Sequence, residues 1–177
     1  QGLLSPQHDV LEIGCGTGST ALRLAPFTRS LLATDVSSQM IDIAHQRLAA
    51  QPSPALRFAV ADAEAMAPGP EVYDAVLAFN VLHLMTDLDD ALRQLVKVLR
   101  PGGLLISKTA CVAEMNPLIP YLAVPLMRAI ATAPPVLCFD EPRLRLAIVQ
   151  QGLPSVCIER HGTRGKGIRA FIVALKP

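Results

Sequence analysis

The sequence predicts an α/β fold: a doubly wound, mostly parallel seven-stranded sheet with helices on both faces and a C-terminal antiparallel hairpin. Short apolar runs of strand length alternate with helical patterns along the first two thirds of the chain. The first run leads straight into a glycine-rich turn, and polar residues follow several of the runs. About half of the 177 residues are apolar, so residues 1–177 are expected to form a single domain with one sizeable core.

The apolar runs define the strands. They cover residues 10–13, 31–34, 56–60, 73–79, 104–109, 155–159 and 168–175. The last two are expected to form the hairpin, joined by a turn at 161–167. Helices are expected to begin at Ser19, after a cap at Ser37 or Ser38, after a cap at Asp87, and after Asp140. Strands that alternate with helices in this way indicate a parallel sheet covered on both faces.

Charge and composition exclude several classes of function. The formal net charge is +1 and no block of like charge is present, so the chain lacks the electrostatic footprint of a nucleic-acid-binding protein. No apolar run is long enough to span a membrane and no signal peptide is visible, which predicts a cytoplasmic protein. The four cysteines form no C-x-x-C pair and have no histidine at zinc-ligand spacing, so no metal is expected and the thiols are expected to be small buried side chains.

The glycine-rich turn reads Glu12-x-Gly14-x-Gly16-x-Gly18. Glycines at a strand-to-helix turn let the backbone approach a ligand closely, because no Cβ is in the way. A dinucleotide site would need its third glycine at position 19, where this chain has Ser19. The pattern alone leaves a plain structural turn open as an alternative.

Polar residues stand at the carboxyl ends of four predicted strands, where ligands bind in open α/β sheets. They are 12–18 after the first strand, Asp35 after the second, Asp62 after the third and 80–83 after the fourth. An acidic residue at the position of Asp35 can accept both hydroxyls of a ribose. A helix-capping aspartate is the alternative for this residue.

Three stretches resemble motifs of the class I S-adenosylmethionine-dependent methyltransferases, of the type that acts on small molecules. They are the glycine turn with Glu12, the stretch 60–66 around Asp62-Ala63, and the turn Arg100-Pro101-Gly102-Gly103 before the fifth strand. Together they lie in the family's order and spacing over residues 9–109.

The resemblance implies S-adenosylmethionine as the cofactor and S-adenosylhomocysteine as its product. It implies that the methionine moiety lies on Glu12, Gly14, Cys15 and Gly16, the ribose on Asp35, the adenine on Val36, Met40, Asp62 and Ala63, and the sulfonium beside Phe79 and Asn80. Methyl transfer is an in-line displacement from an activated donor, so the protein mainly supplies binding and alignment.

The acceptor is expected to be a small, partly apolar metabolite. Family members that methylate nucleic-acid amino groups carry Asn/Asp-Pro-Pro-aromatic after the fourth strand, which 80–83 does not match. His83 is the best-placed candidate base if the acceptor must lose a proton, with a structural role as the alternative. Residues 110–139 are expected to cover the substrate, with Tyr121 and Arg128 as substrate contacts, or else to form helical packing or a homodimer interface.

Two other functions remain open from the sequence. A non-catalytic module that binds S-adenosylmethionine would use the same residues. A nicotinamide-dependent oxidoreductase would need a different glycine pattern and a catalytic Tyr–Lys pair, and neither Tyr73 nor Tyr121 has a lysine nearby in the sequence. Members of the resembled family usually carry helices before the first strand, so these lid helices are expected to be missing or unusually small here.

Overall fold

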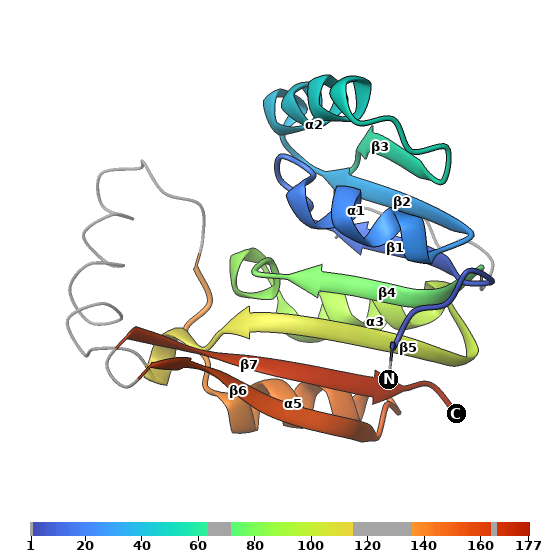
Figure 1. Ribbon diagram of the computed structural model, residues 1–177. Coiled ribbons are helices and arrows are strands. Elements are labelled where there is room, and N and C mark those ends of the chain that lie inside the picture. Colours follow the sequence, from blue (N-terminus) through green and yellow to red (C-terminus); the bar gives the residue numbers. More distant parts are fainter. Residues whose placement is uncertain (1, 64–71, 115–135, 164–165) are drawn as a thin grey trace.

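A seven-stranded sheet organises the computed structural model, which describes residues 2–63, 72–114, 136–163 and 166–177 (Figure 1). The strand order is β3-β2-β1-β4-β5-β7-β6. The strands are β1 Asp9–Ile13, β2 Ser30–Asp35, β3 Leu56–Val60, β4 Tyr73–Phe79, β5 Leu99–Ala110, β6 Ser155–Thr163 and β7 Lys166–Leu175. The first five pair in parallel, while β7 runs antiparallel to both β5 and β6. The predicted fold class is confirmed.

Helices cover both faces of this sheet. They are α1 Ser19–Leu24, α2 Ser38–Ala50, α3 Leu88–Val98 and α5 Glu141–Gln150, with short 3-10 turns η1 Ala25–Phe27, η2 Leu82–Leu84 and η3 Val112–Glu114. The predicted caps Ser37, Asp87 and Asp140 each accept a backbone N–H from the first turn of the helix that follows. The local sequence therefore determines where these three helices begin.

The two faces have separate cores. On the front face, α1 and α2 pack over β1, β2 and β3, with Leu31, Ile41 and Leu77 among the buried side chains (Figure 1). On the back face, α3 and α5 bury Leu92 and Leu144 against β4, β5 and β7. Alternating side chains of one strand enter opposite cores, which explains why β4 is apolar almost throughout.

The predicted C-terminal hairpin is present, but its strands are longer than predicted. His161 pairs with Arg169 and Thr163 pairs with Lys166, so the strands continue through most of the stretch 161–167 that was predicted as a turn. Register shifts beside Ser155 and His161 absorb the irregular sequence as β-bulges. The turn before the fifth strand is also paired, because β5 begins at Leu99 rather than Leu104.

Several predicted features lie outside the described residues, and one prediction about the cysteines is wrong in part. Tyr121, Arg128 and most of the 110–139 stretch lie outside the described residues, as does the loop 64–71. All four cysteines are free. Cys15 and Cys111 are buried as predicted, but Cys138 is exposed and Cys157 is only half-buried, so the prediction of buried thiols is wrong for Cys138 and only partly right for Cys157. Within the described parts of the chain, no helix has the length and apolarity that crossing a membrane requires.

Candidate active site

A cavity of about 400 Å³ lies at the carboxyl ends of the central strands. Six residues predicted from the sequence line it: Gly14, Asp35, Val36, Asp62, Ala63 and Asn80. They come from the ends of β1, β2, β3 and β4, where the topology brings four strand ends together.

The three glycines of the turn have different roles, although all three adopt positive φ angles. A Cβ on Gly14 would lie 2.4 Å from Cγ2 of Val81, and a Cβ on Gly18 would lie 2.4 Å from Cζ of Phe58. A Cβ on Gly16 would meet nothing within 4 Å. Gly14 and Gly18 are therefore required by packing within the protein, while Gly16 leaves open space beside the backbone.

Asp35 ties the glycine turn to the second strand. Its Oδ2 accepts the backbone N–H of Gly16 at 2.8 Å and its Oδ1 accepts that of Ser37 at 3.0 Å. Each carboxylate oxygen keeps a second lone pair, so Asp35 can still accept hydrogen bonds from ligand hydroxyls.

The backbone N–H groups of the turn are largely used within the protein. That of Cys15 donates to the carbonyl of Thr34 at 2.9 Å, that of Gly16 to Asp35, and that of Gly18 to the carbonyl of Cys15 at 3.0 Å. A pyrophosphate-binding turn presents such groups to its ligand. This turn is therefore poorly suited to a dinucleotide.

Glu12 is a buried carboxyl group on the front face of β1, immediately before the turn. The residue is 2% exposed and its Oε2 has no hydrogen-bond partner among the described residues. Burial raises the pKa of Glu12 to about 8, so the carboxyl group is neutral at pH 7. A cationic group placed beside it would satisfy the oxygen and favour ionisation.

Phe79 is the last residue of β4 and Asn80 follows it, and the two side chains line different cavities. Asn80 lines the 400 Å³ cavity, and its φ of 54° is the one positive value outside glycine in the described chain. Its backbone N–H donates to the carbonyl of Lys108 at 2.7 Å, which holds this uncommon conformation. Phe79 lines a different cavity on the front face. The structure therefore separates two residues that the resemblance grouped together.

His83 lies in η2, next to this cavity in sequence but not in its lining. The side chain is half-buried, and its Nδ1 has no partner among the described residues. Burial, and then the charge of Arg169, lower the pKa of His83, so the imidazole is neutral at pH 7. A neutral imidazole is the form in which a histidine can accept a proton.

The remaining predicted residues lie around the cavity rather than in it. Cys15 is buried beneath the turn, and Met40, 39% exposed on α2, is absent from the lining. The sequence analysis missed five lining residues: Ala61, Val81, Leu84, Met85 and Thr86. These residues could have been predicted only from their place in the sequence, because Ala61 precedes Asp62 and the other four lie between Asn80 and the helix cap at Asp87. No cluster of metal-ligating side chains occurs in the described parts of the chain.

Taken together, these groups suit a polar, partly cationic ligand rather than an anionic one. Asp35 and Asp62 offer carboxylates for hydroxyl and amino groups, and none of the described residues that line the cavity is a lysine, arginine or histidine. Gly16 leaves room beside the backbone, and the unpartnered Glu12 stands behind the turn.

Comparison with known proteins gives a consistent result. A family model described as a methyltransferase domain matches residues 10–103. A non-reducing polyketide synthase, dpmpA of Macrophomina phaseolina, is 37% identical over 135 residues, covering 68% of this chain and 6% of that protein. Methyltransferase GfsG of Streptomyces halstedii is 32% identical over 102 residues, covering 56% of this chain and 37% of that protein. The chain thus matches less than half the length of each of these relatives.

Solved structures share the fold at low sequence identity. The YcgJ protein of Bacillus subtilis has a TM-score of 0.78 and 16% identity, over 98% of this chain and 94% of its own. Phosphoethanolamine N-methyltransferase 2 of Haemonchus contortus, in complex with S-adenosyl-L-methionine, has a TM-score of 0.82 and 16% identity, over 99% and 50%. The [4+2]-cyclase SpnF has a TM-score of 0.81 and 20% identity, over 99% and 77%. The fold therefore accommodates more than one reaction.

Proposed function

This chain belongs to the S-adenosylmethionine-dependent methyltransferases, and we propose that it transfers a methyl group to a small, partly apolar metabolite. The observation that supports the proposal most is the shared cavity to which four strand ends contribute Gly14, Asp35, Asp62 and Asn80. The occupied N–H groups of the glycine turn argue against the alternative of a nicotinamide cofactor.

The described residues fit S-adenosylmethionine group by group. Glu12 would hold the cationic amino group, because its buried oxygen lacks a partner and a positive charge would offset the cost of ionising it. Asp35 would take the ribose hydroxyls, and Asp62 with the backbone N–H of Ala63 would read the adenine edge. Val36, 66% exposed at the cavity wall, would pack on the adenine ring.

S-adenosylmethionine supplies a methyl group that is already activated on a sulfonium. The protein residues therefore need to hold the donor and the acceptor in line, and such alignment can contribute roughly 7–11 kcal/mol of the barrier. Asn80, whose uncommon backbone conformation is held by its hydrogen bond to the carbonyl of Lys108, would form the part of the cavity wall that positions the reacting groups.

An acceptor that carries a proton at the reacting atom must lose it. We assign that task to His83, whose neutral imidazole can accept the proton as the new bond to carbon forms. The carbonyl of His83 accepts the N–H of Leu137 at 2.7 Å, so the stretch 136–139 lies beside this residue.

The names of the relatives suggest the acceptor. Several of them are polyketide synthases, and a polyketide is a small, partly apolar compound with ionisable O–H or C–H groups. We propose an acceptor of this chemical class, with the reacting atom beside His83.

Calorimetry with S-adenosylhomocysteine and with NADH tests the cofactor assignment. The expected result is binding of S-adenosylhomocysteine alone, weakened at least about tenfold by Asp62→Asn through loss of a charged hydrogen-bond acceptor. Asp42→Asn, at an exposed position on α2, serves as the matched control and should leave the affinity unchanged. A preference for NADH would contradict the proposal. Binding without methyl transfer to any polyketide-type acceptor would indicate a non-catalytic binding module.

A further inference from the structure

The helix α2 packs directly against the glycine-rich turn. A Cβ on Gly18 would lie 3.1 Å from the Cβ of Ala44, so the turn and the helix are in close contact at this point. Ala44 is fully buried there. Arg47 follows three residues later on α2, so its side chain leaves the helix on the same side as Ala44. Figure 1 shows α1 and α2 together on the front face of the sheet.

Arg47 uses this position to hydrogen-bond the far end of the turn. Its Nη1 donates to the carbonyl of Thr17 at 3.3 Å, to Oγ1 of Thr17 at 2.8 Å and to Oγ of Ser19 at 2.6 Å. Thr17 stands between the second and third glycines, and Ser19 is the first residue of α1. One guanidinium nitrogen therefore joins the turn and the start of α1 to α2.

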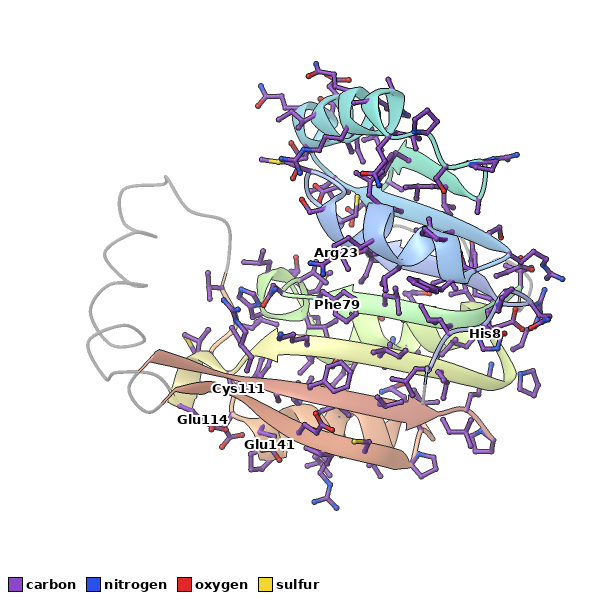
Figure 2. The ribbon with its side chains drawn as sticks, viewed as in Figure 1. His8, Arg23, Phe79, Cys111, Glu114 and Glu141 are labelled. Carbon is purple, nitrogen blue, oxygen red and sulfur yellow. The ribbon has the colours of Figure 1, made fainter. Side chains whose placement is uncertain are left out.

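These contacts use the charge of Arg47 in full. Arg47 forms no ion pair with a carboxylate of the described residues. Its positive charge therefore acts on the three neutral oxygens, and hydrogen bonds from a charged donor are stronger than those between neutral groups. In the described chain, no other side chain donates a hydrogen bond to Thr17 or Ser19. Figure 2 shows Arg23 of α1 on the side of that helix toward Phe79, away from α2.

The turn needs such support because of its glycines. Gly16 and Gly18, on either side of Thr17, both have positive φ angles, 54° and 74°. Glycine loses more conformational freedom on ordering than any other residue, so a turn built on it is costly to hold in one shape. Asp35 holds the N–H of Gly16 from the end of β2, and Arg47 holds the next part of the turn from α2. Binding to a turn that is already ordered does not have to supply this entropy.

We propose that Arg47 is a positioning residue for the cofactor, which keeps the glycine-rich turn in the shape that receives the methionine moiety. The inference rests on the proposed function, because it takes this moiety to lie on the turn. It goes further by assigning part of the affinity to a residue outside the lining of the 400 Å³ cavity. The adenosine part of the ligand would lie on Asp62 and Ala63, with which Arg47 makes no hydrogen bond. Arg47 should therefore affect one end of the ligand only.

Calorimetry with S-adenosylhomocysteine and with 5′-methylthioadenosine separates the two ends. The second compound keeps the adenosine and the thioether but lacks the amino acid. Arg47→Met removes the donors while keeping an unbranched side chain, and it should weaken S-adenosylhomocysteine about fivefold and leave 5′-methylthioadenosine unchanged. The matched control Arg145→Met, at an exposed position on α5, should leave the affinity for both compounds unchanged.

Two further variants test the hydrogen bonds themselves. All three contacts come from one nitrogen, so the single ammonium of Arg47→Lys can replace it, and this variant should stay within about twofold of the wild type. In a background of Thr17→Val with Ser19→Ala, two of the three acceptors are gone. Arg47→Met should then weaken S-adenosylhomocysteine by less than about twofold more, because the effects of contacting residues do not add.

The outcomes distinguish a positioning role from a structural one. Unchanged S-adenosylhomocysteine affinity in Arg47→Met would overturn the inference. So would an equal weakening of both compounds, because it would reflect a general loss of structure, or a lysine variant as weak as the methionine variant. Failure of the wild type to bind either compound would instead contradict the proposed function, and this inference with it.

Discussion

Replacing Glu12 by glutamine removes a buried ionisable group while keeping its shape. The carboxyl group is 2% exposed and one of its oxygens has no partner in the described chain. Its pKa is about 8 in the folded protein, against an ordinary value of 4.5. Between these two values the folded protein retains a proton that the unfolded chain has released.

The sign of the pH dependence follows from this difference. Below pH 4.5 both states are protonated at Glu12, and the group does not make stability depend on pH. As the pH rises from 4.5 to about 8, the unfolded chain releases the Glu12 proton while the folded protein keeps it. The free energy of unfolding therefore falls by about 1.4 kcal/mol per pH unit. The total loss from this group amounts to roughly 5 kcal/mol and levels off above pH 8.

Urea denaturation of the wild type and of Glu12→Gln at several pH values between 5 and 9 measures this loss. The free energy of unfolding of the wild type should fall relative to that of the variant by roughly 3 kcal/mol between pH 5 and pH 8. The comparison uses the change in the free energy of unfolding with pH, so a constant cost of burying the glutamine amide does not affect it, because that amide does not titrate. Parallel curves for the two proteins would refute the reasoning, because Glu12 would then be ionised or hydrated in the folded state.

The other predictions concern packing, catalysis and acid stability. Gly14→Ala should lower the free energy of unfolding by about 3 kcal/mol and be partly rescued by Val81→Ala, since the new Cβ meets that side chain. Gly16→Ala should cost only about 1 kcal/mol from its positive φ, yet weaken S-adenosylhomocysteine in calorimetry; equal losses in both glycine variants would contradict this distinction. His83→Gln should lower turnover while leaving S-adenosylhomocysteine affinity unchanged, and unaltered turnover would remove its assigned role. Hydrogen bonds from Arg29 and Ser30 hold the pKa of Asp9 well below its usual range, so the ionised carboxylate should stabilise the fold by about 1 kcal/mol above pH 4. The wild type should lose this contribution to the free energy of unfolding on acidification, whereas Asp9→Asn should not. The same fall in the free energy of unfolding with acid in both proteins would argue against this network.

Much of the fold could be predicted because local signals agree with the global topology. The strands at Leu56–Val60 and Tyr73–Phe79 have the predicted bounds, since each is a short apolar run with turn residues on both sides. Ser37 and Asp87 start their helices as predicted, because capping is decided within four residues. The predicted hairpin is present, but its strands extend further than predicted, because β6 and β7 pair with each other through His161 and Thr163 and a bulge accommodates this stretch despite the preference of its glycines for a turn.

The candidate site was only partly predictable, for a physical reason. Sequence spacing identifies which residues end a strand, but not which side each one faces. Gly14 lines the cavity, but the space left by its missing Cβ is occupied by Val81 and is not free for a ligand. Phe79 was expected beside its neighbour Asn80 and instead lines the front-face cavity, because consecutive strand residues alternate in direction. The orphaned oxygen of Glu12 depends on burial by long-range packing, which no local pattern reports.

The central claim is that four strand ends form one site for an adenosyl cofactor. A crystal structure of the protein soaked with S-adenosylhomocysteine tests it most directly. The account predicts density in the 400 Å³ cavity, with the ribose at Asp35, the adenine at Asp62 and the amino group within hydrogen-bond distance of Glu12. Density in the front-face cavity, or an amino group remote from Glu12, would contradict it.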